Sequence, residues 1–426
     1  MTVAGFVFLV MIGLMVFNVP IALCTGLAAL VGVLIADVPL MVVVQRMFTG
    51  LDTFTLIAVP LFILTGRFMA VGGITRDLIN MSRVLVGFMK GGLAYINIVA
   101  SMLFAGITGS AASDSASIGA ILIPAMEEKG YDKDFAVAVT ATSSTIGVMI
   151  PPSIPMVVYG VAANASIGKL FLGGIIPGIL VGLALMAVSA VITKKKGYPR
   201  DKKVPLSEGV KIILKGIPAL LTIIIILGGI ISGFFTPTEA AGIAAMYSFL
   251  LGAFYYRELK IKEIPKLVGE IAITTGQVTL MIATASALAW LFAQQNVPAA
   301  IGGFLTGITT NTFLLLLIIN FWLLFVGTWL DLSPAVIIFT PILLPIAVAL
   351  GVDPVHFGVI MTVNLAVGLF TPPVGVCLFI CCGIAKCSIT SVVKSFIPFF
   401  VAMIMVLLLI TYVPQLVMFL PNLMMP

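Results

Sequence analysis

Hydroxyl and carboxylate side chains gather in two short segments of the sequence that share one pattern. The first segment, 106–117, reads GITGSAASDSAS, and the second, 327–333, reads GTWLDLS. Both segments lie among apolar residues, where an acidic side chain is costly and therefore marks a functional site. Hydroxyl, carboxylate and free carbonyl oxygens are the ligands that hard cations take in proteins. The two segments therefore predict sites for a small cation, a polar substrate, or both.

Each polar segment is followed by a sequence that is expected to interrupt a helix. The interruptions read TSSTIGVMIPPSIP at 142–155 and VNLAVGLFTPPVGV at 363–376. Proline lacks a backbone donor and clashes with the carbonyl one turn earlier, so carbonyl oxygens become free inside the membrane. The half-helix after each interruption offers unpaired amides and a positive dipole end to a carboxylate. A cation site beside an anion site is the arrangement expected for sodium-coupled uptake of an organic anion.

One offset of 221 positions (327 − 106 = 221) relates the two segments and the two interruptions. The offset pairs glycines and prolines: Gly106 with Gly327, Pro124 with Pro345, Gly147 with Gly368, and Pro151-Pro152 with Pro372-Pro373. It also places Ser110 opposite Asp331. Matched interruptions in two halves of a chain indicate the binding site of a secondary transporter. The alternative is that these residues only allow close helix packing, as small residues do in membranes.

Individual side chains in these segments could serve in more than one role. Asp331 could contact the polar end of a substrate, bind a cation or cap a half-helix, and the sequence does not separate these roles. Asp114 precedes a helical run, so it could be an N-cap. Ser143, Ser144 and Asn364 lie just before the interruptions and can add side-chain oxygens.

Composition indicates which elements position these segments. Hydrophobic residues make up 61 % of the chain and charged residues only 9 %, a balance typical of a protein embedded in lipid. We predict an all-α polytopic membrane protein with two inverted-topology repeats, each containing a re-entrant helical hairpin and a broken transmembrane helix. The odd number of crossings in the first repeat inverts the second.

The apolar runs set the expected boundaries. The first repeat is predicted to have spans near 4–17, 20–35 and 53–72, an amphipathic stretch at 73–90, a hairpin at 92–127, a broken helix at 133–163 and a span at 170–192. The second is predicted to have spans near 217–233, 237–255 and 270–293, a hairpin at 300–350, a broken helix at 354–380 and a span at 394–415. Five parts follow: scaffold helices and an arm in 1–90 and again in 217–299, transport parts in 91–192 and 300–426, and a basic cytoplasmic loop in 193–216.

The charge distribution predicts the orientation. The net charge is +6, and basic residues concentrate at 194–215 and 257–266. The positive-inside bias places such clusters in the cytoplasm, which puts the N-terminus in the periplasm and leaves only Arg46 and Lys169 of the 22 basic residues outside. The clusters are expected to face membrane lipid rather than nucleic acid.

The remaining reactive residues do not favour catalysis. Four cysteines lie at 377, 381, 382 and 387, with no acidic residue among them, and the only histidine, His356, is distant. A thiolate metal site needs closed coordination, and no nucleophile–base set is evident. We therefore expect neither an enzyme, nor a cofactor, nor a transition metal, with sodium as the only metal ion. A self-sufficient anion permease with the same broken repeats remains an alternative.

Four segments together resemble the large membrane subunit of tripartite ATP-independent periplasmic (TRAP) transporters. They are GITGSAASDSASIGAILIPAMEEKGY, TSSTIGVMIPPS, FFTPTEAAG and NLAVGLFTPPVG. The resemblance covers essentially the whole chain. It implies a sodium-driven elevator of the ion-transporter superfamily in the bacterial inner membrane. It also implies two partners, a small four-helix membrane subunit and a soluble periplasmic substrate-binding protein, with this chain as the unfused form.

The resemblance also implies which residues form the sites. Sodium is expected at two sites, one formed by the first tip and interruption and one by the second; the residues are Gly106, Ser110, Ser144, Gly147, Val148, Pro151, Gly327, Asp331, Gly368 and Thr371. Substrate is expected at Ser110, Ser153, Asp331, Ser333 and Asn364.

Family substrates are organic acids such as sialic acids and C4-dicarboxylates. Asp331 would tolerate one carboxylate and many hydroxyls better than two carboxylates, and neither interruption contains an arginine. Sialic acid is therefore the first expectation, and a C4-dicarboxylate or a sugar acid is the next.

Overall fold

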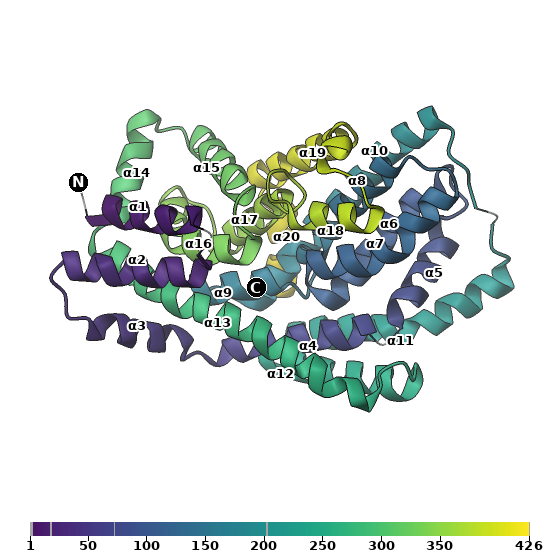
Figure 1. The fold of residues 1–426 in the computed structure, drawn as a ribbon, viewed down its shortest axis with the longest axis horizontal. Coiled ribbons are helices and arrows are strands. Elements are labelled where there is room, and N and C mark those ends of the chain that lie inside the picture. The colour runs from purple at the N-terminus through teal and green to yellow at the C-terminus, as the bar shows by residue number, and fades with distance from the viewer. Residues whose placement is uncertain (1–2, 18, 72, 202, 426) are drawn as a thin grey trace.

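The computed structural model describes residues 3–17, 19–71, 73–201 and 203–425. These residues form twenty α-helices and no β-strand (Figure 1). Six helical segments in this part of the chain are long and apolar enough to cross a membrane; they are Phe54–Val71, Ile167–Lys196, Leu206–Ile231, Ile264–Gln294, Leu332–Ala349 and Ile389–Tyr412. The all-helical membrane architecture predicted from the sequence is confirmed.

The first repeat begins with ordinary helices and ends with a hairpin and a broken helix. Its opening helices are α1 (Val3–Val16), α2 (Ile21–Ile35), α3 (Met41–Leu51), α4 (Ala58–Val71) and α5 (Ile74–Val86), with a short 3₁₀ turn, η1 (Phe54–Ile57), before α4. The hairpin consists of α6 (Gly92–Thr108) and α7 (Ala111–Glu128). The broken helix consists of α8 (Lys133–Ser144), η2 (Thr145–Val148) and α9 (Ile154–Ala163), and α10 (Ile167–Lys196) follows.

The second repeat has the same order of elements. Its opening helices are α11 (Leu206–Ile231), α12 (Pro237–Leu250) with a π-helical end, η3 (Leu251–Tyr255), then a 3₁₀ turn, η4 (Ile261–Glu263), α13 (Ile264–Gln294) and α14 (Val297–Ile308). The hairpin is α15 (Thr312–Gly327) with α16 (Leu332–Ala349). The broken helix is α17 (Pro354–Gly368) with α18 (Val376–Ala385), followed by α19 (Ile389–Tyr412) and α20 (Gln415–Met424).

Three boundaries differ from the sequence expectation. The interval 300–350 holds three helices, because α14 is separate and the second hairpin starts only at Thr312. The basic segment 193–216 is largely helical, since α10 continues to Lys196 and α11 begins at Leu206, leaving a short connection between them. Helix α3 lies between the predicted spans 20–35 and 53–72, where the apolar runs predict no span. The end of α10 and the start of α11 contain lysine, glutamate and leucine, which favour helix even in a polar segment.

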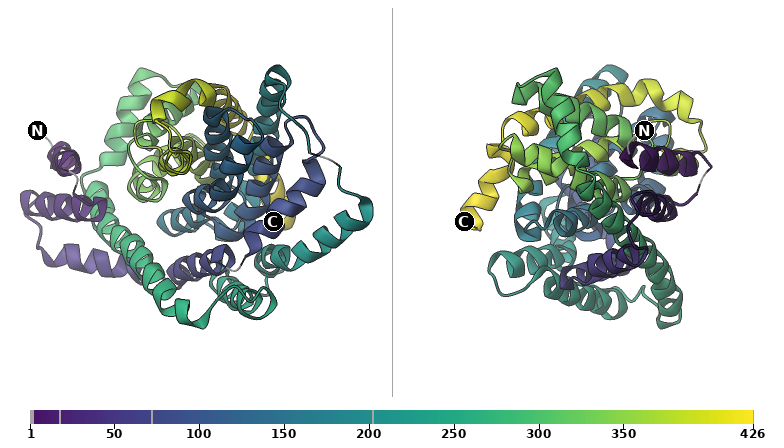
Figure 2. Two further views of the ribbon diagram at one scale, coloured as in Figure 1. Left: turned by 45° about the vertical axis from the view of Figure 1, so that its right-hand side comes forward. Right: turned by 90° about the vertical axis from the view of Figure 1, so that its left-hand side faces the viewer.

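The helices form two groups. Figure 1 shows α2, α3, α4 and α11–α13 along the lower side of the molecule, with both hairpins and both broken helices above them. Figure 2 confirms this division from two further directions. Small side chains bring the lower helices close together: Thr25 on α2 and Thr284 on α13 share a hydrogen bond of 2.8 Å. We call the lower group the scaffold and the upper group the hairpin body.

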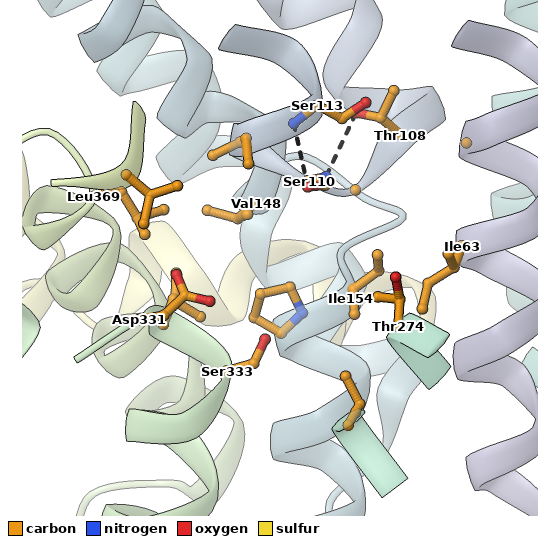
Figure 3. Close-up of a pocket in the computed structure, with 18 of the residues that line it drawn as sticks. Ile63, Thr108, Ser110, Ser113, Val148, Ile154, Thr274, Asp331, Ser333 and Leu369 are labelled. Carbon is orange, nitrogen blue, oxygen red and sulfur yellow. Dashed lines mark hydrogen bonds between the residues drawn. The ribbon is translucent and has the colours of Figure 1, made fainter. Parts of the chain in front are cut away.

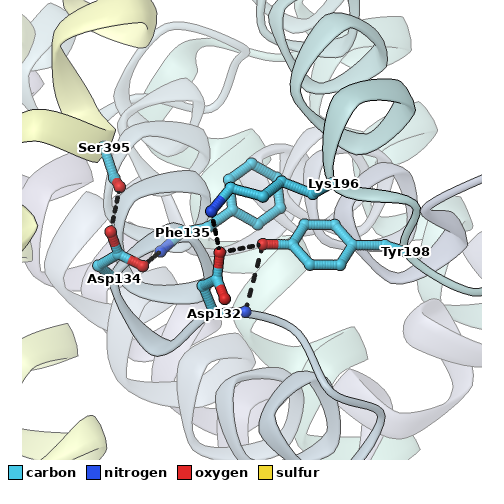
Figure 4. A network of polar contacts seen from close by, with 6 residues as sticks. All are labelled: Asp132, Asp134, Phe135, Lys196, Tyr198 and Ser395. Atoms are coloured by element: carbon cyan, nitrogen blue, oxygen red, sulfur yellow. Dashed lines mark hydrogen bonds and ion pairs between the residues drawn. The ribbon is translucent and has the colours of Figure 1, made fainter.

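A polar clasp ties the connection after α10 to the start of the first broken helix (Figure 4). Lys196 Nζ lies 2.6 Å from Asp132 Oδ2, and the Tyr198 hydroxyl donates to the same oxygen at 2.8 Å. These two hydrogen bonds hold the pKa of the Asp132 carboxyl below its ordinary value. Asp201 then contacts Lys129 on the hairpin side and Arg83, 3.5 Å away, on α5.

Candidate functional site

A cavity of about 500 Å³ lies where the two hairpin tips face the scaffold. Figure 3 shows Asp331 and Ser333 of the second tip on one side, Ser110 and Thr108 of the first tip above, and Ile63 of the scaffold opposite. The lining residues come from six places: the first tip (108–113 and Ala116), the first interruption (Val148, Ile154, Pro155), the second tip (331–334), the second interruption (Leu369, Val376, Cys377), α4 (Ile63, Gly66, Arg67) and α13 (Thr274, Gln277, Val278, Met281). The volume is ordinary for a small-molecule site.

The turn of the first tip contains a glycine, Gly109, that lies too close to the first interruption for any other residue. Gly109 has φ of +61°, and a Cβ there would stand 2.6 Å from the Pro152 carbonyl oxygen. Ser110 then begins α7 as its N-cap, accepting a hydrogen bond from the Ser113 amide. The Ile154 amide donates to the Gly109 carbonyl at 3.4 Å. The tip and the interruption therefore form one structural unit.

Asp114 lies behind this tip and has half of its carboxylate unpaired. Its side chain is fully buried. The Thr108 hydroxyl donates to Oδ1, but Oδ2 finds no hydrogen-bond donor among the described residues. Oδ2 points at the interruption, because a Cβ built on Gly147 would come within 2.3 Å of it. An isolated buried carboxylate costs several kcal/mol, so this pocket of oxygen atoms fits a small cation.

The N-cap role that the sequence allowed for Asp114 is wrong. Ser110 occupies the N-cap of α7, and Asp114 lies one turn inside the helix. Its acidic side chain in an apolar run still marks Asp114 as a candidate for a functional role.

The second tip meets its interruption through backbone contact. A Cβ on Gly368 would stand 2.2 Å from the Gly327 carbonyl oxygen, so only glycine allows this approach. The Val374 amide donates to the Thr328 carbonyl at 3.2 Å. Asp331 occupies the N-cap position of α16, yet its side chain makes no hydrogen bond to the first helical turn. Its carboxylate instead faces the cavity. Both Pro-Pro bonds, 151–152 and 372–373, are cis.

Buried amides and hydroxyls fix each broken helix to a hairpin arm. In the first repeat, the Asn97 amide donates to Thr140 at 2.6 Å and Ser143 donates to Asn97 at 3.0 Å. In the second repeat, the Asn364 amide donates to the Asn320 side chain at 2.8 Å. Ser143 and Asn364 are the partners that the 221 offset predicts. Both anchor helices behind the site.

The predicted site residues fall into two sets. Four of them line the cavity: Ser110, Val148, Asp331 and Ser333. Ser153 and Asn364, expected at the substrate, lie outside the lining; Ser153 is buried, caps α9 and donates to the Val148 carbonyl at 2.6 Å. The other predicted sodium residues also lie outside the lining, in or beside the tips and interruptions; they are Gly106, Ser144, Gly147, Pro151, Gly327, Gly368 and Thr371.

The scaffold wall of the cavity was not predicted. Neither interruption contains arginine, but the fold brings Arg67 from α4 to the lining. Arg67 Nη2 lies 2.5 Å from Glu270 Oε2 on α13, and both side chains are about half exposed. Sequence patterns within one helix could not reveal that α4 and α13 face the tips. Among the described residues, no group of histidine, cysteine and acidic side chains could hold a metal ion.

Comparison with known proteins identifies relatives along almost the full length. The family model described as "Tripartite ATP-independent periplasmic transporter, DctM component" matches residues 8–416. The isethionate TRAP transporter permease protein of Oleidesulfovibrio alaskensis is 45% identical over 95% of this chain, which spans 64% of that longer protein. The sialic acid TRAP transporter large permease protein of Vibrio cholerae is 40% identical, covering 89% of each chain.

A solved structure shares the fold at low sequence identity. The YdaH transporter of Alcanivorax borkumensis superimposes with a TM-score of 0.62 at 12% identity, covering 87% of this chain and 86% of that one. This likeness concerns the architecture alone.

Proposed function

Because the chain belongs to the DctM component family of tripartite ATP-independent periplasmic transporters, we propose that it carries out sodium-coupled uptake of an organic anion through the cavity between its hairpin tips. Its family makes it a transporter permease and not an enzyme. In the proposal, sodium and substrate bind to the hairpin body, and this body moves against the scaffold as an elevator.

The unpaired Oδ2 atom of the Asp114 carboxylate is the observation that carries the sodium proposal. This atom is buried, without a donor among the described residues, and faces Gly147. A bound sodium ion would supply the missing positive charge. Thr108, whose hydroxyl already contacts this carboxylate, would be a further ligand, together with carbonyl oxygens of the first interruption.

A second sodium site is proposed at the second tip. The 221 offset places Ala335 opposite Asp114 (335 − 114 = 221), so the second repeat has no buried acid at the equivalent position. Asp331 is the acidic residue nearest in sequence to that position. We propose that Asp331 binds the second sodium ion together with Gly327, Gly368 and Thr371, around the second interruption.

The substrate is proposed to be an organic anion with one strongly acidic group and hydroxyl groups. Ser110, Ser113 and Ser333 supply hydroxyls to the cavity, and Asp331 would repel a second carboxylate near the second tip. Relatives named for sialic acid and for isethionate transport both fit this class. Sialic acid is the first candidate, followed by isethionate, sugar acids and C4-dicarboxylates.

Two partners complete the proposed transporter. Substrate would arrive on a periplasmic binding protein, and a small membrane subunit would bind the scaffold in the bacterial inner membrane. Parts 91–192 and 300–426 would move, while 1–90 and 217–299 would stay fixed.

Reconstitution tests this proposal directly. Uptake of labelled sialic acid and of isethionate should be measured in proteoliposomes with all three components, then with each component omitted. We expect uptake only with an inward sodium gradient and with the binding protein present. Equal uptake in potassium buffer would refute the coupling, and full activity of this chain alone would favour an independent anion permease.

A further inference from the structure

The cavity has one positive and one negative wall. Its described lining contains two charged side chains, Arg67 on α4 and Asp331 at the second tip. Figure 3 shows Asp331 on the opposite side of the cavity from Ile63, which lies one helical turn before Arg67 on α4. An anion with a hydroxylated end would therefore experience a directional field.

The positive wall lies directly against the first tip. A Cβ on Gly66 would stand 3.0 Å from the Thr108 Cα and carbonyl oxygen. This close approach places the α4 backbone beside the tip and leaves Arg67, the next residue, at the edge of the cavity. Arg67 therefore reaches the same space as Ser110 and Ser113.

Glu270 forms an ion pair with Arg67, and the Arg67 side chain stays partly exposed. The pair is 2.5 Å apart, and 45% of the Arg67 side chain and 43% of the Glu270 side chain are exposed. Exposed ion pairs contribute little to stability, and a guanidinium group can exchange one carboxylate for another with the same geometry. An anionic substrate can therefore displace Glu270.

We propose that Arg67 is the anion contact of this cavity and that Glu270 competes with the substrate's acidic group for it. This inference rests on the proposed uptake of an organic anion and adds the group that orients it. The acidic group faces α4, and the hydroxyls face Asp331, which accepts their hydrogen bonds. Because Arg67 belongs to the scaffold, the hairpin body reaches it only in the conformation that brings the first tip against Gly66.

The competition predicts shifts of opposite sign. In Arg67→Gln the cavity loses its anion contact, so the Kd for sialic acid or isethionate should rise about tenfold. In Glu270→Gln the competitor is removed, so the same Kd should fall several-fold and its salt dependence should steepen. Arg67→Lys, which keeps the charge but loses the fork geometry, should lie between the parent and Arg67→Gln.

A merely structural ion pair would behave differently. Both Arg67→Gln and Glu270→Gln would then break the same bond and shift the Kd in the same direction. Lys133→Gln is the control, because it removes an exposed ion pair, with Glu127 at 3.5 Å, from a position outside the cavity lining. It should leave the Kd unchanged.

The measurement is equilibrium binding of each probe to the purified parent chain and variants in sodium buffer. Opposite shifts in Arg67→Gln and Glu270→Gln support the proposal. Shifts of equal sign, or none, in a parent that binds either probe overturn this inference and leave the proposed function standing. Binding of neither probe to the parent overturns the substrate class and this inference with it.

Discussion

At the scale of single residues, the two glycine contacts behind the tips differ from ordinary helix glycines. Gly147 leaves room for the Asp114 carboxylate, and Gly368 lets backbone touch backbone at Gly327. The Gly368 contact involves backbone atoms and cannot be relieved by rotating a side chain, and a Cβ at Gly147 would require the buried Asp114 side chain to move. Both positions are therefore more sensitive to a methyl group than their apolar neighbours are.

Gly368→Ala should abolish uptake while the protein still inserts into the membrane. The new Cβ would collide with the Gly327 carbonyl oxygen at 2.2 Å, which separates the second tip from its interruption. Gly383→Ala is the matched control, because a Cβ there meets nothing within 4 Å. Alanine in a helix is favoured over glycine by about 0.5–1 kcal/mol, so the control should be neutral or slightly stabilised. Uptake assays on equal amounts of inserted protein compare the two, and normal uptake by Gly368→Ala would show that the contact is dispensable.

Asp114→Asn should reduce sodium-dependent uptake by at least about tenfold. The amide keeps the shape of the side chain but removes the charge that would hold sodium. The half-saturating sodium concentration should rise by a similar factor. Glu128→Gln, at the exposed end of the same helix, should behave as the parent. An unchanged sodium requirement in Asp114→Asn would move the site elsewhere.

At the scale of elements, the repeat pattern predicted some helices closely and others poorly. Helices α7 (Ala111–Glu128) and α16 (Leu332–Ala349) are related by 221 positions at both ends (332 − 111 = 221 and 349 − 128 = 221). Glycines at the tips and interruptions beside these helices are required by close contacts, as at Gly109 and Gly368, so the spacing is readable from the sequence. The scaffold is less regular, because α3, η1 and α4 in one repeat stand where α13 runs unbroken in the other. Lipid-facing helices tolerate many apolar residues, and so their sequence carries little boundary information.

The candidate site, like the fold, could be predicted only in part from the sequence. Ser110 and Asp331 could be predicted because glycines and prolines nearby in the sequence indicate where the helices are interrupted. Arg67 could not be found, since it reaches the cavity only after α4 packs against the first tip. Local patterns reveal the residues of the tips and interruptions, and tertiary packing alone reveals the wall that they face.

The clasp between Asp132, Lys196 and Tyr198 predicts a pH effect on stability. The pKa of Asp132 is lowered by its hydrogen bonds to Lys196 and Tyr198. A lowered folded-state pKa means that the stabilisation is complete above the unfolded value of about 3.9 and is lost as the pH falls through the folded value. The Tm of the parent in detergent should therefore drop more between pH 5 and pH 3 than the Tm of Asp132→Asn. Parallel curves would show that the clasp adds nothing to stability.

At the scale of the whole molecule, the division into scaffold and hairpin body predicts which crosslinks stop transport. Gly168 on α10 faces α11, and a Cβ there would lie 3.0 Å from Ile230 Cγ2. Gly26 and Thr284 lie within the scaffold, with a built Cβ 3.5 Å from the Thr284 Cβ, in the range for a disulfide.

Oxidising Gly168→Cys/Ile230→Cys should block uptake almost fully, and reduction should restore it. The Gly26→Cys/Thr284→Cys pair should leave uptake unchanged, because both residues stay fixed. The five native cysteines must first be replaced, and crosslinking must be measured by mobility on gels. Undiminished uptake with a complete Gly168–Ile230 crosslink would show that α10 belongs to the fixed part.

The placement of acidic residues near the cavity also determines how membrane voltage acts on the cycle. Asp114 and Asp331 lie on the hairpins, whereas Arg67 lies on the scaffold. If the hairpin body moves as proposed, its two carboxylates cross the electric field and the arginine does not. A voltage negative inside acts on each moved charge with about 2.3 kcal/mol per 100 mV. It would drive the empty body, with two negative charges, back outward, while two bound sodium ions would offset the two carboxylates and leave the loaded body with only the charge of the substrate anion. The resting potential would then accelerate the empty return step, and collapsing it should slow turnover even when the sodium gradient is kept.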